Sequence, residues 1–324
     1  AQIRSITLLS VRKFCPKRLR GRCLEEVGFM PVIVMAADRI CIAVIQSQWI
    51  FGTLLRKKTI LTNGRYMPLS QYFRLADTMA RMSLRADASK YFLGYIWWIL
   101  EPLLFVGVFY VDFQVILQTR SENYLVFLMC GKFTFIWFSK SVTQASRSIV
   151  GGQGLIGKLN LPKSLFPIAT IQEGLYKQAS VFLLLFVVFI SAGYSVGWHW
   201  LWLVPLAAVN YLLIVACSLG AAFLVCLFFD FTMVVPLAMV FLLFVSGIFW
   251  DPRALPDPAK TELVLGLNPV AFIVDAYRQI FLAGAAPDAM HLLLVGVGSA
   301  FVVLFMLWLI RRNSQYLALK ALTI

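Results

Sequence analysis

Residues 91–110 have the sequence YFLGYIWWILEPLLFVGVFY, in which Glu101 is the only charged side chain. This stretch opens an apolar run, Leu93–Leu117. A helix that crosses the hydrocarbon core of a bilayer needs about 20 mostly apolar residues, and the run is long enough. We therefore predict that the chain is an integral membrane protein.

Further apolar runs follow, and with the first they predict six transmembrane helices. The runs are Leu93–Leu117, Tyr124–Phe138 (extendable to Val142), Ile168–Ala192, Trp200–Phe229, Met233–Phe249 and Met290–Ile310. The composition agrees, because 60% of the 324 residues are hydrophobic and 14% are charged, whereas about 25% of a soluble domain is charged. We expect an all-α integral membrane fold.

Basic residues predict the orientation, because loops rich in Lys and Arg stay in the cytoplasm. Residues 139–163 contain four basic residues and no acid, and the tail after Ile310 contains three and no acid. Residues 251–290 contain five acids against three basic residues, which favours the outside. Four tryptophans then fall at the outer interface, as in an aromatic belt: Trp198, Trp200, Trp202 and Trp250. Both chain ends are predicted to be cytoplasmic.

Residues 69–90 precede the first run and have a helical periodicity. Apolar side chains recur at spacings of three and four, at Tyr72, Leu75, Met79, Met82 and Ala86, while Arg74, Arg81 and Arg85 share another face. This pattern predicts an amphipathic helix on the inner leaflet. The alternative is a solvated helix that packs on a soluble partner.

Residues 1–66 fit the six-helix scheme less well. Phe29–Ile50 is apolar, but Asp38 and Arg39 lie at its centre, and each charge opposes insertion by about 2.5–3.5 kcal/mol. We divide the chain into an extension (1–66), expected to be poorly ordered or outside the functional unit, an interface helix (67–90) and a six-span domain (91–324).

The net charge of +14 raises the question of nucleic acid as a partner. However, 16 of the 29 Lys and Arg residues fall within residues 1–90, next to the membrane, which favours contact with anionic membrane lipids over nucleic acid. The six cysteines form no CxxC and only two histidines are present, so we expect no metal site and no histidine-dependent catalytic residues.

Several motifs, in their order along the chain, resemble the permeases of polysaccharide ABC exporters, particularly those for O-antigen and capsule. The motifs are LGYIWWILEP (93–102), SIVGGQGLIGKLNLPKSLFP (148–167), VSGIF (245–249), LNP (267–269) and AYRQ (276–279). The resemblance covers about residues 70–315. It implies a homodimer in the bacterial inner (plasma) membrane that exports a lipid-linked glycan. It also implies two separate ABC ATPase subunits, which hold ATP and magnesium, so this subunit needs no cofactor of its own.

Residues 152–158 fit the phosphate-binding pattern GxxxxGK. Leu159 replaces the Ser or Thr that would hold magnesium, and no strand is expected before the glycines, so we do not predict ATP binding here. The resemblance instead implies a cytoplasmic coupling helix that contacts the ATPase. Apolar side chains would anchor it and two lysines would meet acids or lipid phosphates; a plain connecting loop is the alternative. The predicted coupling residues are Gly154, Leu155, Ile156, Lys158, Leu159 and Lys163.

Charged and aromatic residues in the spans are candidates for the translocation path. Glu101 precedes Pro102, which removes a helical hydrogen bond and favours a kink. Lys132 either pairs with Asp112 at a similar depth or faces the pore and attracts a lipid-linked phosphate. Glu173 and Lys177 are four residues apart, which favours a structural pair. The aromatic candidates, which would stack on sugar rings, are Tyr91, Tyr95 and Trp98.

Between the fifth and sixth runs, two apolar pieces, Thr261–Leu267 and Asn268–Leu282, follow a proline-rich segment. Neither can cross a 30 Å core at 1.5 Å per residue. We predict short re-entrant helices on the periplasmic side, which line an exit gate at Asn268, Pro269, Tyr277 and Arg278. A static periplasmic cap is the alternative.

Two other classes of function remain as alternatives to the permease. An ion-coupled secondary transporter commonly contains paired repeats with broken helices, and the sequence shows no such repeat. A membrane-embedded glycolipid transferase would need clustered Asp, His or Arg on one loop, and the acidic segment 251–288 is too rich in proline and apolar residues to provide them.

Overall fold

The computed structural model describes residues 68–111, 124–159, 161–191 and 197–323. These residues belong to the unit Met67–Ile324 of the chain. The predicted extension 1–66 lies outside the described residues. Within the described ranges, helices are the only regular secondary structure.

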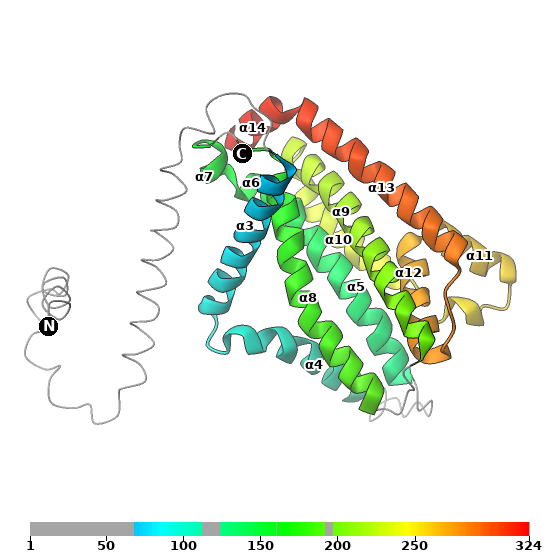
Figure 1. Ribbon diagram of the computed structural model, residues 1–324. Coiled ribbons are helices and arrows are strands. Elements are labelled where there is room, and N and C mark those ends of the chain that lie inside the picture. Colours follow the sequence, from blue (N-terminus) through cyan, green and yellow to red (C-terminus); the bar gives the residue numbers. More distant parts are fainter. Residues whose placement is uncertain (1–67, 112–123, 160, 192–196, 324) are drawn as a thin grey trace, which may run out of the picture. The chain divides into compact units, whose positions relative to one another are not determined.

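The helices fall into long and short groups (Figure 1). The longer helices are α3 (Leu69–Lys90), α4 (Trp97–Tyr110), α5 (Tyr124–Ser146), α8 (Leu165–Ser191), α9 (Leu203–Leu227), α10 (Phe231–Val245) and α13 (Ala289–Arg312). The shorter ones are η1 (Gly94–Ile96), α6 (Ser148–Gly151), α7 (Gln153–Ile156), η3 (Trp198–Trp202), η4 (Pro252–Ala254), α11 (Pro258–Leu267), α12 (Pro269–Arg278), the π-helical turn η5 (Gln279–Ala283) and α14 (Ser314–Thr323).

Three helical segments of the described chain are long and apolar enough to cross a membrane: Leu165–Ile190, Trp198–Leu227 and Ala289–Arg312. They match the third, fourth and sixth predicted runs. Two further apolar helices are shorter, Gly94–Phe105 and Phe231–Val245. The fold is therefore all-helical with three clear candidate spans, and the six-span count stays a prediction.

The second predicted run proved too short. Helix α5 extends beyond Phe138 to Ser146, over 23 residues, or about 34 Å at 1.5 Å per residue. Its last two turns are polar, but Ser141, Val142 and Ala145 are buried. The helix continues because this polar segment packs against neighbouring helices, which hydropathy alone cannot reveal.

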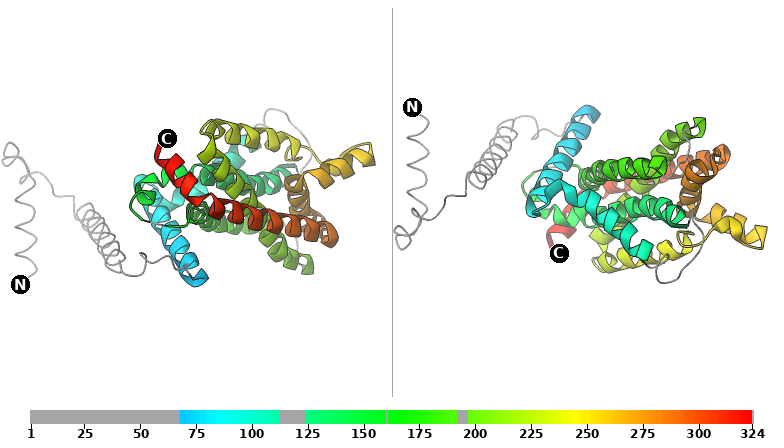
Figure 2. Two further views of the ribbon diagram at one scale, coloured as in Figure 1. Left: turned by 90° about the horizontal axis from the view of Figure 1, so that it is seen from above. Right: turned by 90° about the horizontal axis from the view of Figure 1, so that it is seen from below.

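The core lies around α5 and α9. Helix α5 packs against α8, α9, α10 and α12, while α9 also packs against α13 and α14. Figure 2 shows the same arrangement from two sides, with α3 near one end of the bundle and α11 near the other. Phe133 of α5 and Leu206, Ile214 and Leu219 of α9 are among the largest fully buried side chains.

Helix α3 has the predicted extent, and its contact with the inner leaflet stays a prediction. Its buried positions are Ala76, Ala80, Leu84 and Ala88, at a spacing of four, and it packs against α8. Ala86, which was predicted to share the apolar face, is exposed. Of the larger apolar side chains on the predicted face, Tyr72, Leu75 and Met79 also pack against the core. The small alanine side chains let α3 approach α8 closely.

Candidate functional site

A cavity of about 250 Å³ opens between α4, α5 and α10. It brings together two residues predicted for the translocation path, Glu101 and Lys132, with a further cation, Lys140. The lining consists of Glu101, Phe105, Lys132, Phe135, Ile136, Ser139, Lys140, Thr143, Pro236, Met239, Val240 and Leu243. Apolar walls with a few charged groups are the usual composition of a ligand-binding cavity.

Glu101 forms an ion pair across the cavity wall. Its carboxylate lies 2.5 Å from the Lys140 ammonium, which links α4 to α5. Pro102 follows within α4, where the backbone hydrogen bond that a proline cannot donate is missing. Sequence reasoning counted Lys140 only as a basic loop residue, because the end of α5 was placed before it.

Lys132 is half-buried, and its ammonium lies 5.8 Å from the centroid of the Phe105 ring. Within the described ranges no carboxylate forms an ion pair with Lys132. The alternative partner, Asp112, lies outside the described residues. The ring of Phe105 therefore supplies a cation–π contact on the cavity side of Lys132.

The aromatic candidates for the path do not line this cavity. Tyr91 stacks on Trp97, with ring centroids 6.3 Å apart, and Tyr95 meets Trp98 edge to face at 5.0 Å. Tyr91 and Tyr95 are more than half exposed. They lie where the chain turns from α3 into α4, so a path through the cavity would meet them only near this turn.

Lys177 of α8 joins three elements. Its ammonium lies 2.6 Å from Glu173, which confirms the predicted pair, and 2.9 Å from Asp87 of α3. It also lies 5.7 Å from the ring centroid of Trp98. Burial opposes ionisation of Asp87, but the hydrogen bonds from Lys177 and Lys90 outweigh it and lower the pKa of Asp87 to about 2. Sequence spacing missed Asp87, because the contact spans 90 residues.

The predicted coupling segment contains the single-turn helix α7, which Gly152 joins to another single-turn helix, α6. A Cβ at position 152 would lie 2.5 Å from the Phe166 ring, so the turn requires glycine. The helix α6 precedes the glycines where a phosphate-binding loop has a strand. Residues 152–158 therefore fold differently from the nucleotide loop that their pattern resembles.

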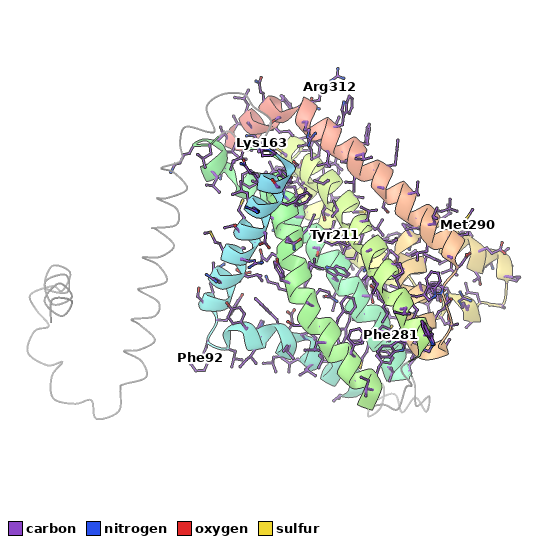
Figure 3. The ribbon with its side chains drawn as sticks, in the orientation of Figure 1. Phe92, Lys163, Tyr211, Phe281, Met290 and Arg312 are labelled. Carbon is purple, nitrogen blue, oxygen red and sulfur yellow. The ribbon has the colours of Figure 1, made fainter. Side chains whose placement is uncertain are left out.

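The coupling residues divide between the surface and the interior. Gly154 and Lys158 are exposed. Ile156 is buried, and Leu155 and Leu159 pack against the core of their own chain. Lys163 is also buried, and it donates a hydrogen bond to the Leu161 carbonyl at 3.2 Å; Figure 3 shows it beside the start of α3. Gly154 and Lys158 are thus the members that this conformation presents to a partner.

The C-terminal helix α14 packs against the two short helices of this region, α6 and α7. It also packs against α9, with Leu317 and Ala321 fully buried. The thiol of Cys226 lies 3.4 Å from the Leu317 carbonyl. A Cβ at position 157 would lie 3.5 Å from Leu322. The C-terminal helix therefore helps to hold α7 in place, a contact that the sequence analysis did not foresee.

The segment predicted as a gate is densely packed. Asn268 caps α12 by accepting hydrogen bonds from the Val270 and Ala271 amides, and its own amide nitrogen lies 3.0 Å from Ser246. Pro269 occupies the first position of α12, where a missing N–H costs nothing. Tyr277 and Arg278 are buried. In this conformation neither side chain is exposed to a substrate.

Asp275 is the buried acid of the same helix. Arg253 forms a two-pronged contact with its carboxylate, at 2.9 to 3.1 Å, and Gln279 donates a hydrogen bond to it at 2.7 Å. In the sequence, Arg253 and Asp275 are recognisable only as charges of the segment between the fifth and sixth runs. Their pairing ties η4 to α12.

The chain was compared with families and curated proteins. No family model matches it. It is 26% identical to the O-antigen export system permease protein RfbA of Klebsiella pneumoniae, over 67% of this chain and 83% of the relative. It is 25% identical to the protein of the same name from Myxococcus xanthus, over 74% and 91%. It is 27% identical to the polysialic acid transport protein KpsM of Escherichia coli, over 64% and 81%.

These relatives match 64–74% of this chain and 81–91% of their own lengths. It agrees with the resemblance drawn from the five sequence motifs. Over most of its length, this chain is similar to O-antigen export system permease proteins and to polysialic acid transport proteins.

Proposed function

We propose that this chain is the permease subunit of an ABC transporter that exports a lipid-linked polysaccharide across the bacterial inner membrane. The observation that carries the proposal is the similarity to O-antigen export permeases over two thirds of the chain and 83% of the relative. The all-helical fold with three clear candidate spans fits a multi-pass membrane protein.

In this proposal α4, α5, α8, α9, α10 and α13 provide six spans, with both termini in the cytoplasm. The segment 146–163 and the tail after Ile310 carry basic residues and no acid, and the packing of α14 against α6 and α7 brings them to one end of the bundle. That end would be cytoplasmic by the positive-inside rule. Helices α11 and α12 would then lie on the periplasmic side.

The proposed assembly is a homodimer that binds two ATPase subunits. Gly154 and Lys158 would contact the ATPase, because both are exposed in the coupling segment. A tryptophan at position 154 tests this contact, since a Cβ there meets no atom within 4 Å and the substitution should fold normally. Gly266→Trp is a matched control, because position 266 is equally open and lies on α11.

The experiment measures ATP hydrolysis by the ATPase reconstituted with each permease variant. We expect Gly154→Trp to remove the stimulation of hydrolysis by the permease, and Gly266→Trp to leave it unchanged. Undiminished stimulation in a correctly assembled Gly154→Trp complex would contradict coupling through this segment.

The cavity between α4, α5 and α10 is proposed as part of the path, with Lys132 attracting the phosphate of the lipid-linked substrate. Its ammonium is a candidate because its contact there is an aromatic ring. Export by Lys132→Ala and by Asp112→Ala, each checked for assembly, separates the two roles. Loss of export in Lys132→Ala alone supports the path; equal losses support an ion pair instead.

A further inference from the structure

Arg278 joins the two helices that form most of the cavity wall. Its guanidinium donates hydrogen bonds to the carbonyls of Gly247 at 2.6 Å and Ile248 at 2.8 Å, in the turn after α10. It also donates to the Phe127 carbonyl of α5 at 3.4 Å. The guanidinium carbon lies 3.5 Å from the centroid of the Phe127 ring. One side chain of α12 therefore bridges α5 and the end of α10.

Gly131 of α5 leaves room for the guanidinium of Arg278. A Cβ at position 131 would lie 2.5 Å from a guanidinium nitrogen of Arg278, so a side chain at this position would displace the guanidinium. Gly247, whose carbonyl accepts the shortest of these hydrogen bonds, has φ +68°, a conformation that favours glycine. Gly131 thus provides the space for the guanidinium, and Gly247 provides the backbone turn whose carbonyl accepts its hydrogen bond.

The bridge lies where the cavity ends. Helix α5 lines the cavity from Thr143 back to Lys132, and Gly131 follows directly. Helix α10 lines it from Pro236 to Leu243, and the turn with Gly247 follows four residues later. The two helices pack side by side, so Arg278 fastens them just past the cavity, at the end towards α12.

The described hydrogen-bond partners of Arg278 are neutral backbone carbonyls. Among the described residues, no carboxylate forms an ion pair with it, whereas Arg253 nearby is paired with Asp275. Separating a buried ion pair leaves an uncompensated charge and is costly. Carbonyl oxygens, in contrast, have close substitutes in water and in sugar hydroxyl groups. A guanidinium held by carbonyls can therefore release them when such oxygens enter the space.

We propose that Arg278 is a releasable latch that closes the α12 end of the cavity and opens to let substrate out. The proposal rests on the proposed function and its orientation, and it assigns Arg278 the role of a positioning residue. The Arg253–Asp275 pair and the Asn268–Ser246 contact keep α12 itself in place while the latch opens.

The test measures access to the cavity from outside the cell. Leu243→Cys places a thiol in the cavity wall, and a membrane-impermeant maleimide added to intact cells reports its exposure. The same cells without Leu243→Cys give the background from native cysteines. Two further variants are compared in the Leu243→Cys protein: Arg278→Ala, and Lys260→Ala as the control, since Lys260 is an exposed basic residue that lies on α11 and not on α12.

We expect Arg278→Ala to raise the rate of labelling about tenfold or more, because one charge-assisted hydrogen bond is worth about that factor in an opening equilibrium. Arg278→Lys should give an intermediate rate, since an ammonium cannot reach all three carbonyls with the same geometry. Lys260→Ala should label at the parent rate. Equal rates for Arg278→Ala and the parent, with both assembled in the membrane, would overturn the latch.

Gly131→Ala is the second variant, for use if Arg278→Ala does not assemble. Its methyl group should displace the guanidinium and raise labelling while keeping the charge; labelling at the parent rate would overturn the proposal. Polysaccharide at the surface of the same cells is measured separately. If the parent protein exports polysaccharide but Arg278→Ala and Gly131→Ala do not raise the labelling rate, the latch alone is refuted. If the parent protein exports no polysaccharide, the proposed function is refuted.

Discussion

The Asp87 carboxylate of α3 lies 2.9 Å from the Lys177 ammonium of the candidate span α8. Lys177 is shared with Glu173, at 2.6 Å, and Asp87 also pairs with Lys90 at 3.0 Å. The network fixes α3 along α8 in a single register. It also gives the contact between these helices a defined dependence on pH.

The pKa of Asp87 is lowered in the folded protein to about 2, from about 3.9 for an unperturbed aspartate. A lowered pKa contributes stability that is complete above the unfolded value and is lost as the pH falls towards the folded value. The stabilisation by Asp87 should therefore be full above about pH 4 and disappear towards about pH 2.

Thermal unfolding of the purified protein and of Asp87→Asn checks this expectation. We expect Asp87→Asn to lower the midpoint by about 2–4 °C at pH 7, as for a loss of about 1 kcal/mol. The difference should shrink between about pH 4 and 2. Glu262→Gln, at an exposed position on α11, should show no such difference. A gap between wild type and Asp87→Asn that stayed constant down to pH 2 would contradict the assignment.

The Glu101–Lys140 pair at 2.5 Å predicts a coupling between α4 and α5. Both side chains are partly exposed, so we expect each single neutral variant, Glu101→Gln and Lys140→Gln, to lose no more than about 1 kcal/mol of stability. The double variant should lose less than the sum of the two, as a double-mutant cycle measured by unfolding would show. Strict additivity would mean that the two charges do not interact.

The close contact of α3 with α8 predicts that larger side chains are not tolerated there. Ala80 is 1% exposed, and Ala80→Leu should destabilise the protein by about 1–3 kcal/mol, because three added carbons must displace α8. Ala86→Leu is the matched control, since Ala86 lies on the same helix but is exposed. Thermal unfolding distinguishes them, and equal effects would show that α3 does not dock through its small residues.

The packing of α14 predicts an effect on the proposed ATPase contact. Leu317 is fully buried against neighbouring helices, while Leu319 is 66% exposed on the same helix. Leu317→Ala should cost about 2–5 kcal/mol and, by loosening α7, reduce the stimulation of ATP hydrolysis. Leu319→Ala should change neither quantity by much. Full stimulation in a folded Leu317→Ala protein would separate α14 from coupling.

Local features of this fold could be predicted from the sequence. The extent of α3 and of the long helices α8, α9 and α13 followed from periodicity and from uninterrupted apolar length. The Glu173–Lys177 pair followed from a spacing of four on one helix. In each case the feature depends only on residues that are close together in the sequence.

Contacts between distant segments could not be predicted in this way. The partner of Glu101 is Lys140, 39 residues away. The partners of Arg278 are three backbone carbonyls, which lie 30, 31 and 151 residues away. Backbone carbonyls leave no trace in a sequence pattern. Gly131 resembles any other helical glycine until Arg278 is seen to fill the space beside it.

The contact between α3 and α8 also has a consequence for the order of synthesis. Asp87 leaves the ribosome 90 residues before Lys177, which corresponds to about 5–18 s at about 5–20 residues per second. During that interval the first helix of the unit has no α8 to pack against. The buried alanines of α3 therefore gain their packing partner only when α8 has been made, so insertion of α8 completes a contact whose first half was synthesised well before.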